Sequence, residues 1–205
     1  IEAARRAGVR RVVYTSVIGN GTEMQTGFAA TQRANRQAEA DLAASGLEWV
    51  VARNGFYLDI DVEQMRAANA RGWYASSSGD GRCCYVSIAE LAFATAQLVA
   101  GDRPARRCYN LVGEAISVPD LTRLVNEVFG FRVEYRLLSD AQKLESSRAD
   151  LRVVARGGEE IAQMFAGLMQ GQRLGAFDVP SDFEAAAGRP CKSMREMLRE
   201  LAAPG

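Results

Sequence analysis

The first half of the chain carries a strand–helix–strand pattern that restricts the fold more than any other feature. Residues 9–15 (VRRVVYT) follow Gly8 and are rich in β-branched and aromatic side chains, so they predict a strand. Residues 31–45 are rich in alanine and predict a helix that ends at Gly46. Residues 47–53 (LEWVVAR) predict a second strand. Because a helix joins the two strands, they are expected to be parallel, with their carboxyl ends side by side.

The rest of the sequence predicts further helices and shorter strands. Apolar spacing and β-branched content predict helices over 61–70, 88–99, 118–129, 161–169 and 194–201, and strands over 108–112 and 133–137. Serines followed three residues later by Asp, Glu or Gln are typical of helix N-termini, and they occur at Ser87, Ser117, Ser139, Ser181 and Ser193. The residues therefore predict an α/β layer followed by a mostly helical C-terminal lobe.

The composition is that of a globular protein, and it excludes several functions. The chain has 205 residues, 48% of them hydrophobic, with 25 basic and 25 acidic side chains and no histidine. Zero net charge argues against a nucleic-acid partner, and no apolar run approaches the ~20 residues of a membrane span. The lack of histidine excludes Ser-His-Asp triads, Cys-His pairs and histidine metal sites. The cysteines are expected to be buried thiols in a reducing cytoplasm: Cys83, Cys84, Cys108 and Cys191.

Polar residues follow both predicted strands of the first half at their carboxyl ends. Thr15 and Ser16 close the first strand, and Asn54 and Gly55 follow the second. Ligands of open parallel sheets bind beside the carboxyl ends of the strands, so these residues predict a site. The Ser16 hydroxyl could equally begin a loop, and Phe56 could equally pack in the core. The sequence contains no complete G-x-G-x-x-G, no P-loop and no Tyr-x-x-x-Lys pair.

Four segments together carry a family resemblance: IEAARRAGVRRVVYTS, EADLAASGLEWVVARNGFYLD, YVSIAELAFATAQLVAGD and YNLVGEAISVPDLTRLVNEVFG. They resemble the NmrA-like atypical short-chain dehydrogenase/reductase family, with the bacterial NAD(P)H:quinone oxidoreductase type 2 group as the nearest branch. The resemblance implies a Rossmann-like parallel sheet whose first strands and Gly-rich turn precede Ile1. Residues 1–205 would then be an N-terminally truncated NAD(P)-binding domain. Within it, residues 1–72 would be the second half of the Rossmann core, and residues 73–205 a substrate lobe with returning strands.

The resemblance also implies roles for individual residues. The cofactor-binding positions of the family correspond to Thr15, Ser16, Asn54, Gly55 and Phe56. Asn35 stands where relatives carry a catalytic His or Lys, but an amide cannot deliver a proton near neutral pH. The expected walls of the substrate pocket are Tyr57, Trp73 and Tyr85. Five residues are predicted to converge on one cleft at the strand ends: Ser16, Asn35, Asn54, Gly55 and Phe56.

The function implied by the resemblance is that of an NAD(P)H-dependent oxidoreductase, when full length, which reduces quinone-like or related small acceptors. The nicotinamide would supply the hydride, with NADP expected over NAD and no metal. The alternative is a non-catalytic NAD(P)-sensing regulator of the NmrA type, and an epimerase-like or isomerase-like relative or a non-functional fragment also stays open. A cytoplasmic protein is expected, with a small-molecule acceptor and no nucleic-acid or membrane partner, and a homodimer is left open.

Overall fold

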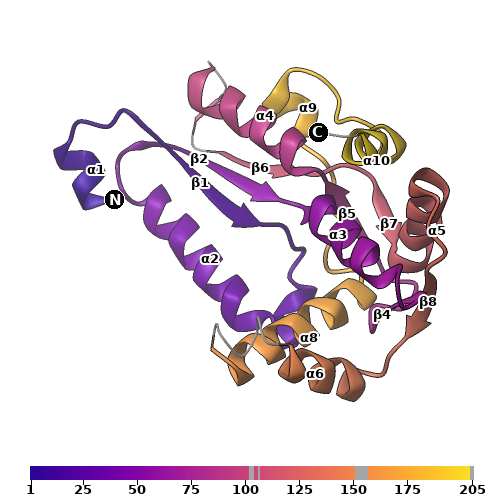
Figure 1. The fold of residues 1–205 in the computed structure, drawn as a ribbon. Helices are drawn as coiled ribbons and strands as arrows, with labels where there is room; N and C mark the ends of the chain where they lie inside the picture. Colours follow the sequence, from indigo (N-terminus) through magenta and orange to yellow (C-terminus); the bar gives the residue numbers. More distant parts are fainter. Residues whose placement is uncertain (102–103, 106, 151–156, 204–205) are drawn as a thin grey trace.

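The computed structural model describes residues 1–101, 104–105, 107–150 and 157–203, which have an α/β architecture (Figure 1). In chain order the elements are α1 (Glu2–Arg6), β1 (Arg11–Val17), the 3-10 helix η1 (Thr22–Gln25), α2 (Ala29–Ala43), β2 (Glu48–Asn54), β3 (Phe56–Tyr57), α3 (Leu58–Ala68), β4 (Trp73–Ser76), β5 (Arg82–Val86), α4 (Ile88–Ala100), β6 (Arg107–Leu111), β7 (Ala115–Ser117), α5 (Val118–Phe129), β8 (Glu134–Leu137), α6 (Asp140–Ala149), α8 (Glu159–Arg173), α9 (Phe183–Ala187) and α10 (Met194–Ala202). Of the helices in these ranges, none has the length and apolar character that crossing a membrane requires.

A parallel sheet in the order β1–β2–β6 forms the first layer. Val13 lies opposite Val50 and Val17 lies opposite Asn54 in the β1–β2 pair, and β6 runs parallel to β2 on its other side. The predicted parallel pair is therefore confirmed, with each strand shifted by one or two residues. Gly46 turns the chain from α2 into β2 with a φ of 78°, a conformation that favours glycine.

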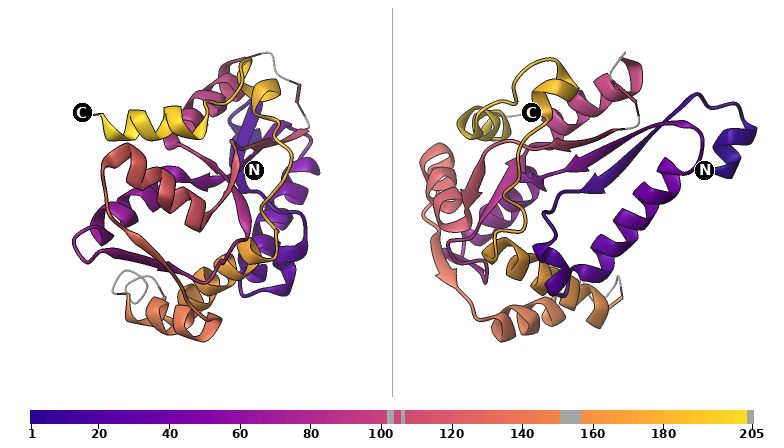
Figure 2. Two further views of the ribbon diagram at one scale, coloured as in Figure 1. Left: turned by 90° about the vertical axis from the view of Figure 1, so that its right-hand side faces the viewer. Right: turned by 180° about the vertical axis from the view of Figure 1, so that it is seen from behind.

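Helices cover both faces of this sheet (Figures 1 and 2). α2 lies on one face, where it meets the side chains of Tyr14 and Ser16. α4 and α9 lie on the opposite face, and their apolar side chains form one core with Val50 and Ala52 of β2. Because side chains alternate along a strand, the position of a residue in β1 or β2 decides which helix it meets.

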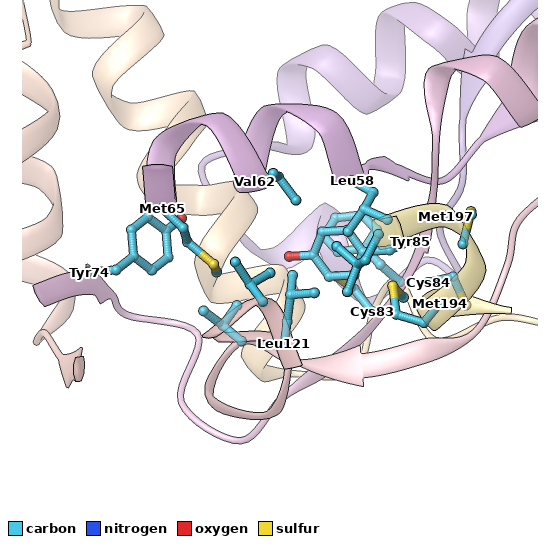
Figure 3. Packing of buried hydrophobic residues seen from close by; sticks show 14 of the residues in the cluster. Leu58, Val62, Met65, Tyr74, Cys83, Cys84, Tyr85, Leu121, Met194 and Met197 are labelled. Carbon is cyan, nitrogen blue, oxygen red and sulfur yellow. The ribbon is translucent and has the colours of Figure 1, made fainter. Parts of the chain in front are cut away.

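Short strands outside this sheet adjoin a larger hydrophobic core. β5 pairs in parallel with β3 and antiparallel with β7, and β4 pairs in parallel with β8. The sequence predicted β6 and β8, whereas β3, β4, β5 and β7 were not predicted. Helix α3 presents Leu58, Val62 and Met65 to this core, where they lie near Tyr74 and Tyr85 (Figure 3). After β8 the described chain is helical, as expected of the C-terminal lobe.

The predicted serine caps are correct for all but one helix. Four of these serines accept a hydrogen bond from the backbone amide three residues on: Ser87, Ser117, Ser139 and Ser193. Ser181 is the exception, because its hydroxyl donates to the carbonyl oxygen of Val112 and the N-cap of α9 is Asp182. The spacing alone did not reveal that the Ser181 hydroxyl is used in a contact between distant segments.

Candidate functional site

A cavity of about 280 Å³ lies at the carboxyl end of β2. Its walls are mostly apolar or aromatic, and its charged side chains are Asp61 and Lys143. The residues that line it are Val17, Phe28, Asn54, Gly55, Phe56, Tyr57, Ile60, Asp61, Gln64, Tyr74, Lys143, Phe165, Leu168 and Met169. Apolar walls with a few polar groups are typical of small-molecule sites.

Asn54 provides an incompletely bonded amide at this strand end. It is the last residue of β2, and only 9% of it is exposed. Its Oδ1 atom is buried and has no hydrogen-bond partner within the described residues. Its Nδ2 atom donates to the hydroxyl of Tyr57 over a long 3.4 Å. Because an unpaired buried amide is costly, a ligand that bonds to Asn54 after rotation of the amide would recover that free energy.

Gly55 and Phe56 hold the strand end against the larger core. A Cβ atom on Gly55 would lie 2.8 Å from the carbonyl oxygen of Cys84, so a larger residue would push β2 and β5 apart. The ring of Phe56 contacts Tyr85 and Phe177, with ring centroids 5.8 and 5.0 Å apart. Phe56 therefore both packs in the core and lines the cavity.

Ser16 belongs to an ion-pair cluster on the α2 face of the sheet. Its hydroxyl donates to Glu39 Oε1 over 2.6 Å, and Arg53 Nε donates to the same oxygen over 3.0 Å. Arg36 contacts both the carboxylate and the Ser16 hydroxyl. Burial opposes ionisation of Glu39, but the hydrogen bonds from Arg53 and Ser16 and the charge of Arg36 outweigh it, so the pKa of Glu39 is lowered.

The predicted convergence on one cleft is wrong for Ser16. In the parallel register Ser16 lies beside Arg53, whereas Asn54 lies beside Val17. Successive side chains of a strand point to opposite faces, so Ser16 and Asn54 lie on opposite sides of the sheet. Val17, which was not predicted, takes the cavity position on β1. Thr15 is exposed and lies outside the lining residues.

The predicted convergence is also wrong for Asn35. Its Oδ1 atom accepts a hydrogen bond of 3.1 Å from the hydroxyl of Tyr14, and its Nδ2 atom donates to the carbonyl oxygen of Thr31. These bonds hold the amide between α2 and β1, and Asn35 does not line the cavity. Asn54, Gly55 and Phe56 do meet there, as predicted.

Of the three predicted pocket walls, the cavity includes Tyr57 alone. Trp73 lies outside it, with the guanidinium groups of Arg71 and Arg136 4.6 and 5.1 Å from its ring. Tyr85 is 1% exposed and packs behind Phe56. The next residue in β4, Tyr74, lines the cavity instead, because neighbouring side chains of a strand alternate.

Several lining residues were not predicted, although helical spacing gave a signal for them. On α3, Gln64 follows Ile60 by four residues and Asp61 by three, which places the three side chains on the side of the helix that also carries its N-cap residue, Tyr57. Phe165, Leu168 and Met169 have the same spacing on α8, and the sequence had predicted a helix there without assigning it to a site. Phe28 and Lys143 had no such signal.

Asp61 and Tyr74 form the polar side of the cavity. The Tyr74 hydroxyl donates to Asp61 Oδ1 over 2.9 Å, and it lies 3.4 Å from Gln64 Oε1. Burial raises the pKa of Asp61, although the hydroxyls of Tyr74 and Tyr85 and the charge of Lys143 oppose that rise. Burial and the nearby carboxylate also raise the pKa of Tyr74 well above its ordinary value. Tyr74 therefore remains a hydrogen-bond donor at physiological pH.

Comparisons with known proteins support the resemblance inferred from the sequence. Residues 1–96 match the sequence family described as NAD(P)H-binding. An NmrA-like family domain-containing oxidoreductase of Aspergillus flavus is 32% identical over 145 residues, which are 68% of this chain and 45% of that protein. Quinone oxidoreductase 2 of Escherichia coli is 29% identical over 205 residues, which cover 98% of this chain and 68% of that protein.

A solved structure supports the fold. The NADPH-dependent quinone oxidoreductase of Escherichia coli complexed with NADPH superimposes with a TM-score of 0.81 at 24% identity, covering 98% of this chain and 68% of that one. This similarity confirms the Rossmann-like parallel-sheet class. The chain spans 45% to 68% of the length of these relatives. The predicted resemblance is thus confirmed as a similarity: the chain is similar to an NmrA-like oxidoreductase and to a quinone oxidoreductase, and residues 1–96 match the NAD(P)H-binding family.

Proposed function

We propose that the protein is an NAD(P)H-dependent oxidoreductase that reduces a small quinone-like acceptor in the cavity at the carboxyl end of β2. The observation that carries this proposal is the place of the cavity, because it lies beside Asn54 at the edge where parallel sheets bind ligands. Both curated relatives are described as oxidoreductases, and one of them as a quinone oxidoreductase.

The residues at the strand end fit the nicotinamide part of such a cofactor. A nicotinamide has a flat ring and a carboxamide, and the site offers aromatic walls and the unpartnered amide oxygen of Asn54. Asn54, Gly55 and Phe56 would hold this part, and the exposed Thr15 would lie beside the remainder of the cofactor. The reduced nicotinamide supplies the hydride when it is bound. We propose NADP ahead of NAD because the structural relative was solved with NADPH.

The apolar walls of the cavity would orient the acceptor and exclude water. Phe28, Phe56 and Leu168 present hydrocarbon surface to the cavity, and exclusion of water strengthens the polar interactions that act during the reaction. Ligand pockets range over roughly 300–1,000 Å³, and the cavity of about 280 Å³ is just below that range. This size favours a planar acceptor of one or two rings.

A cavity-filling variant tests the proposed function. Replacing Leu168→Trp in the whole protein should lower kcat/KM for a simple quinone about tenfold, which corresponds to about 1.4 kcal/mol. Binding of NADPH, followed by its fluorescence, should change much less. Val99→Trp is the matched control, because Val99 is 61% exposed on α4 and lies outside the cavity. Cofactor binding without oxidation in the presence of simple quinones would contradict an enzyme and support the NAD(P)-sensing alternative.

A further inference from the structure

Reduction of a quinone by hydride creates an oxyanion, and the proposed function therefore requires a source of protons. Asn35 cannot be this source, because amides do not release protons near neutral pH and its own groups are bonded to Tyr14 and Thr31. Among the side chains that line the cavity, the one carboxyl group belongs to Asp61. It projects from α3, on the same helix face as Ile60 and Gln64.

The surroundings of Asp61 are those of an acid rather than of a surface ion pair. Tyr74 of β4 donates to its Oδ1 atom over 2.9 Å. Tyr85 and Cys83 of β5 face it from the core, and Lys143 of α6 lines the same cavity and acts on Asp61 through its charge. Burial is the strongest influence on this carboxyl group and raises its pKa. Figure 3 shows Tyr74 and Tyr85 at separate points beneath α3.

We propose that Asp61 donates the proton that completes reduction of the acceptor, with Tyr74 as the residue that positions its carboxyl group. This inference depends on the proposed function, because it assumes that the cavity holds an acceptor. It assigns to α3 and β4 a role that the resemblance had placed at Asn35 on α2. In this chain, where Asn35 replaces the His or Lys of relatives, the proton would come from Asp61 on α3 instead.

The proposed step balances in protons and electrons. The hydride and its electron pair come from the reduced nicotinamide, which is oxidised, and the quinone is reduced. The O–H bond of Asp61 breaks, and a new O–H bond forms on the acceptor oxygen. The carboxylate that remains regains a proton from water when the product leaves. The net reaction consumes one quinone, one NAD(P)H and one proton, and yields one hydroquinone and one NAD(P)⁺.

Asp61→Asn is the first test, because asparagine keeps the size and the acceptor oxygen for Tyr74 but carries no acidic proton. General acids typically contribute about 10²–10⁴-fold to a rate, so kcat for a quinone should fall about a hundredfold or more. Binding of NADPH should be unchanged. Asp59→Asn is the matched control on the same helix, since Asp59 accepts a hydrogen bond from the Ile88 amide and does not line the cavity. It should retain activity.

The pH profile separates an acid from a merely structural residue. An acid acts while protonated, so kcat of the unaltered protein should fall as pH rises through the pKa of Asp61, and Asp61→Asn should lack this decline. The Tyr74 hydroxyl stabilises the carboxylate and lowers its pKa. Tyr74→Phe should therefore move the decline to higher pH. A Tyr74 residue that acted through packing alone would leave the position of the decline unchanged.

Infrared difference spectroscopy gives a measurement independent of turnover. The carbonyl stretch of a protonated carboxyl group should titrate above the ordinary range for aspartate, disappear in Asp61→Asn and titrate at higher pH in Tyr74→Phe.

Three outcomes separate this inference from the proposed function. If Asp61→Asn is folded by circular dichroism and reduces quinone as fast as the unaltered protein, the inference is overturned and the proposed function stands. If the unaltered protein binds NADPH but reduces no quinone, both fail. If Asp61→Asn does not fold, Tyr74→Phe decides: the inference is overturned when kcat of this variant declines at the same pH as kcat of the unaltered protein.

Discussion

Glu39 is the residue that ties α2 to the strand ends, and its removal should destabilise the fold. The carboxylate is 7% exposed and bonds to Ser16, Arg36 and Arg53. In Glu39→Gln the two guanidinium groups lose their counter-charge, which for a buried pair costs about 3 kcal/mol. Urea unfolding of the variant should show this loss. Glu63→Gln is the control, because its pair with Arg66 is exposed and worth less than about 1 kcal/mol.

The same carboxylate makes a prediction about acid stability. Its pKa is lowered in the folded state by Arg53, Ser16 and Arg36 against the opposing effect of burial. A lowered pKa stabilises the fold above the pKa of the unfolded chain, and this contribution is lost as pH falls through the folded pKa. The free energy of unfolding should therefore fall less steeply in acid for Glu39→Gln than for the unaltered protein. Parallel curves from urea titrations at successive pH values would contradict this assignment.

The alternation of side chains between the two faces of a strand explains why the sequence predicted part of the site and missed the rest. Asn54 was predicted because it ends a strand with strong β-branched character, and the register did not matter for that conclusion. Ser16 and Trp73 were misplaced because each lies one residue from the side chain that lines the cavity, Val17 and Tyr74. Only the paired register tells which of two successive residues faces a ligand.

At the scale of elements, two serine-to-alanine changes in α6 should change the free energy of unfolding in opposite directions. Ser139 caps α6 in a complete capping box with Gln142, so Ser139→Ala should lower the free energy of unfolding by about 1 kcal/mol. Ser146 is exposed inside the same helix, and Ser146→Ala should raise it slightly because alanine favours helix. Thermal unfolding followed by circular dichroism measures both. Equal shifts in the same direction would show that the cap is not what stabilises α6.

Long elements were predictable, whereas short paired strands were not. α2, α4 and α5 have alanine-rich or amphipathic sequences, and β1 and β2 have continuous β-branched runs, so local preferences agree with the fold. β4 is four residues long and pairs with β8, about 60 positions later, with Trp73 opposite Glu134. No local pattern encodes such a partner, since the pairing depends on how α3 and α5 pack. The polar side of the cavity depends on this pairing and was missed with it.

On the scale of the whole molecule, the C-terminal segment joins the two hydrophobic cores. Phe183 and Ala186 of α9 pack with α4 in the core on that face of the parallel sheet which α4 covers. Met194 and Met197 of α10 pack in the larger core, beside the short strands. Figure 1 shows both helices on the same side of the molecule as α4. The segment therefore links the layer that holds the strand ends to the lobe that completes the cavity.

Glu90 anchors this segment, and its loss should release the segment before the sheet unfolds. The carboxylate is 2% exposed in α4 and accepts two bonds of 2.7 Å from Arg189 and one of 3.2 Å from the backbone amide of Lys192. The bonds from Arg189 lower the pKa of Glu90 despite its burial. Glu90→Gln keeps the shape but removes the charge, so α9 and α10 should exchange amide hydrogens faster while β2 remains protected.

The control for this prediction is a second ion pair of the same segment, which lies at the surface. Arg195 of α10 pairs with Glu127 of α5 at 2.6 Å, but both side chains are about half exposed. Solvent screens such a pair, so Glu127→Gln should leave exchange in α9 and α10 nearly unchanged. Hydrogen exchange measured by mass spectrometry resolves the segments separately. If Glu90→Gln accelerated exchange in β2 as much as in α10, the molecule would open as one unit, and the two cores would not be separable by this anchor.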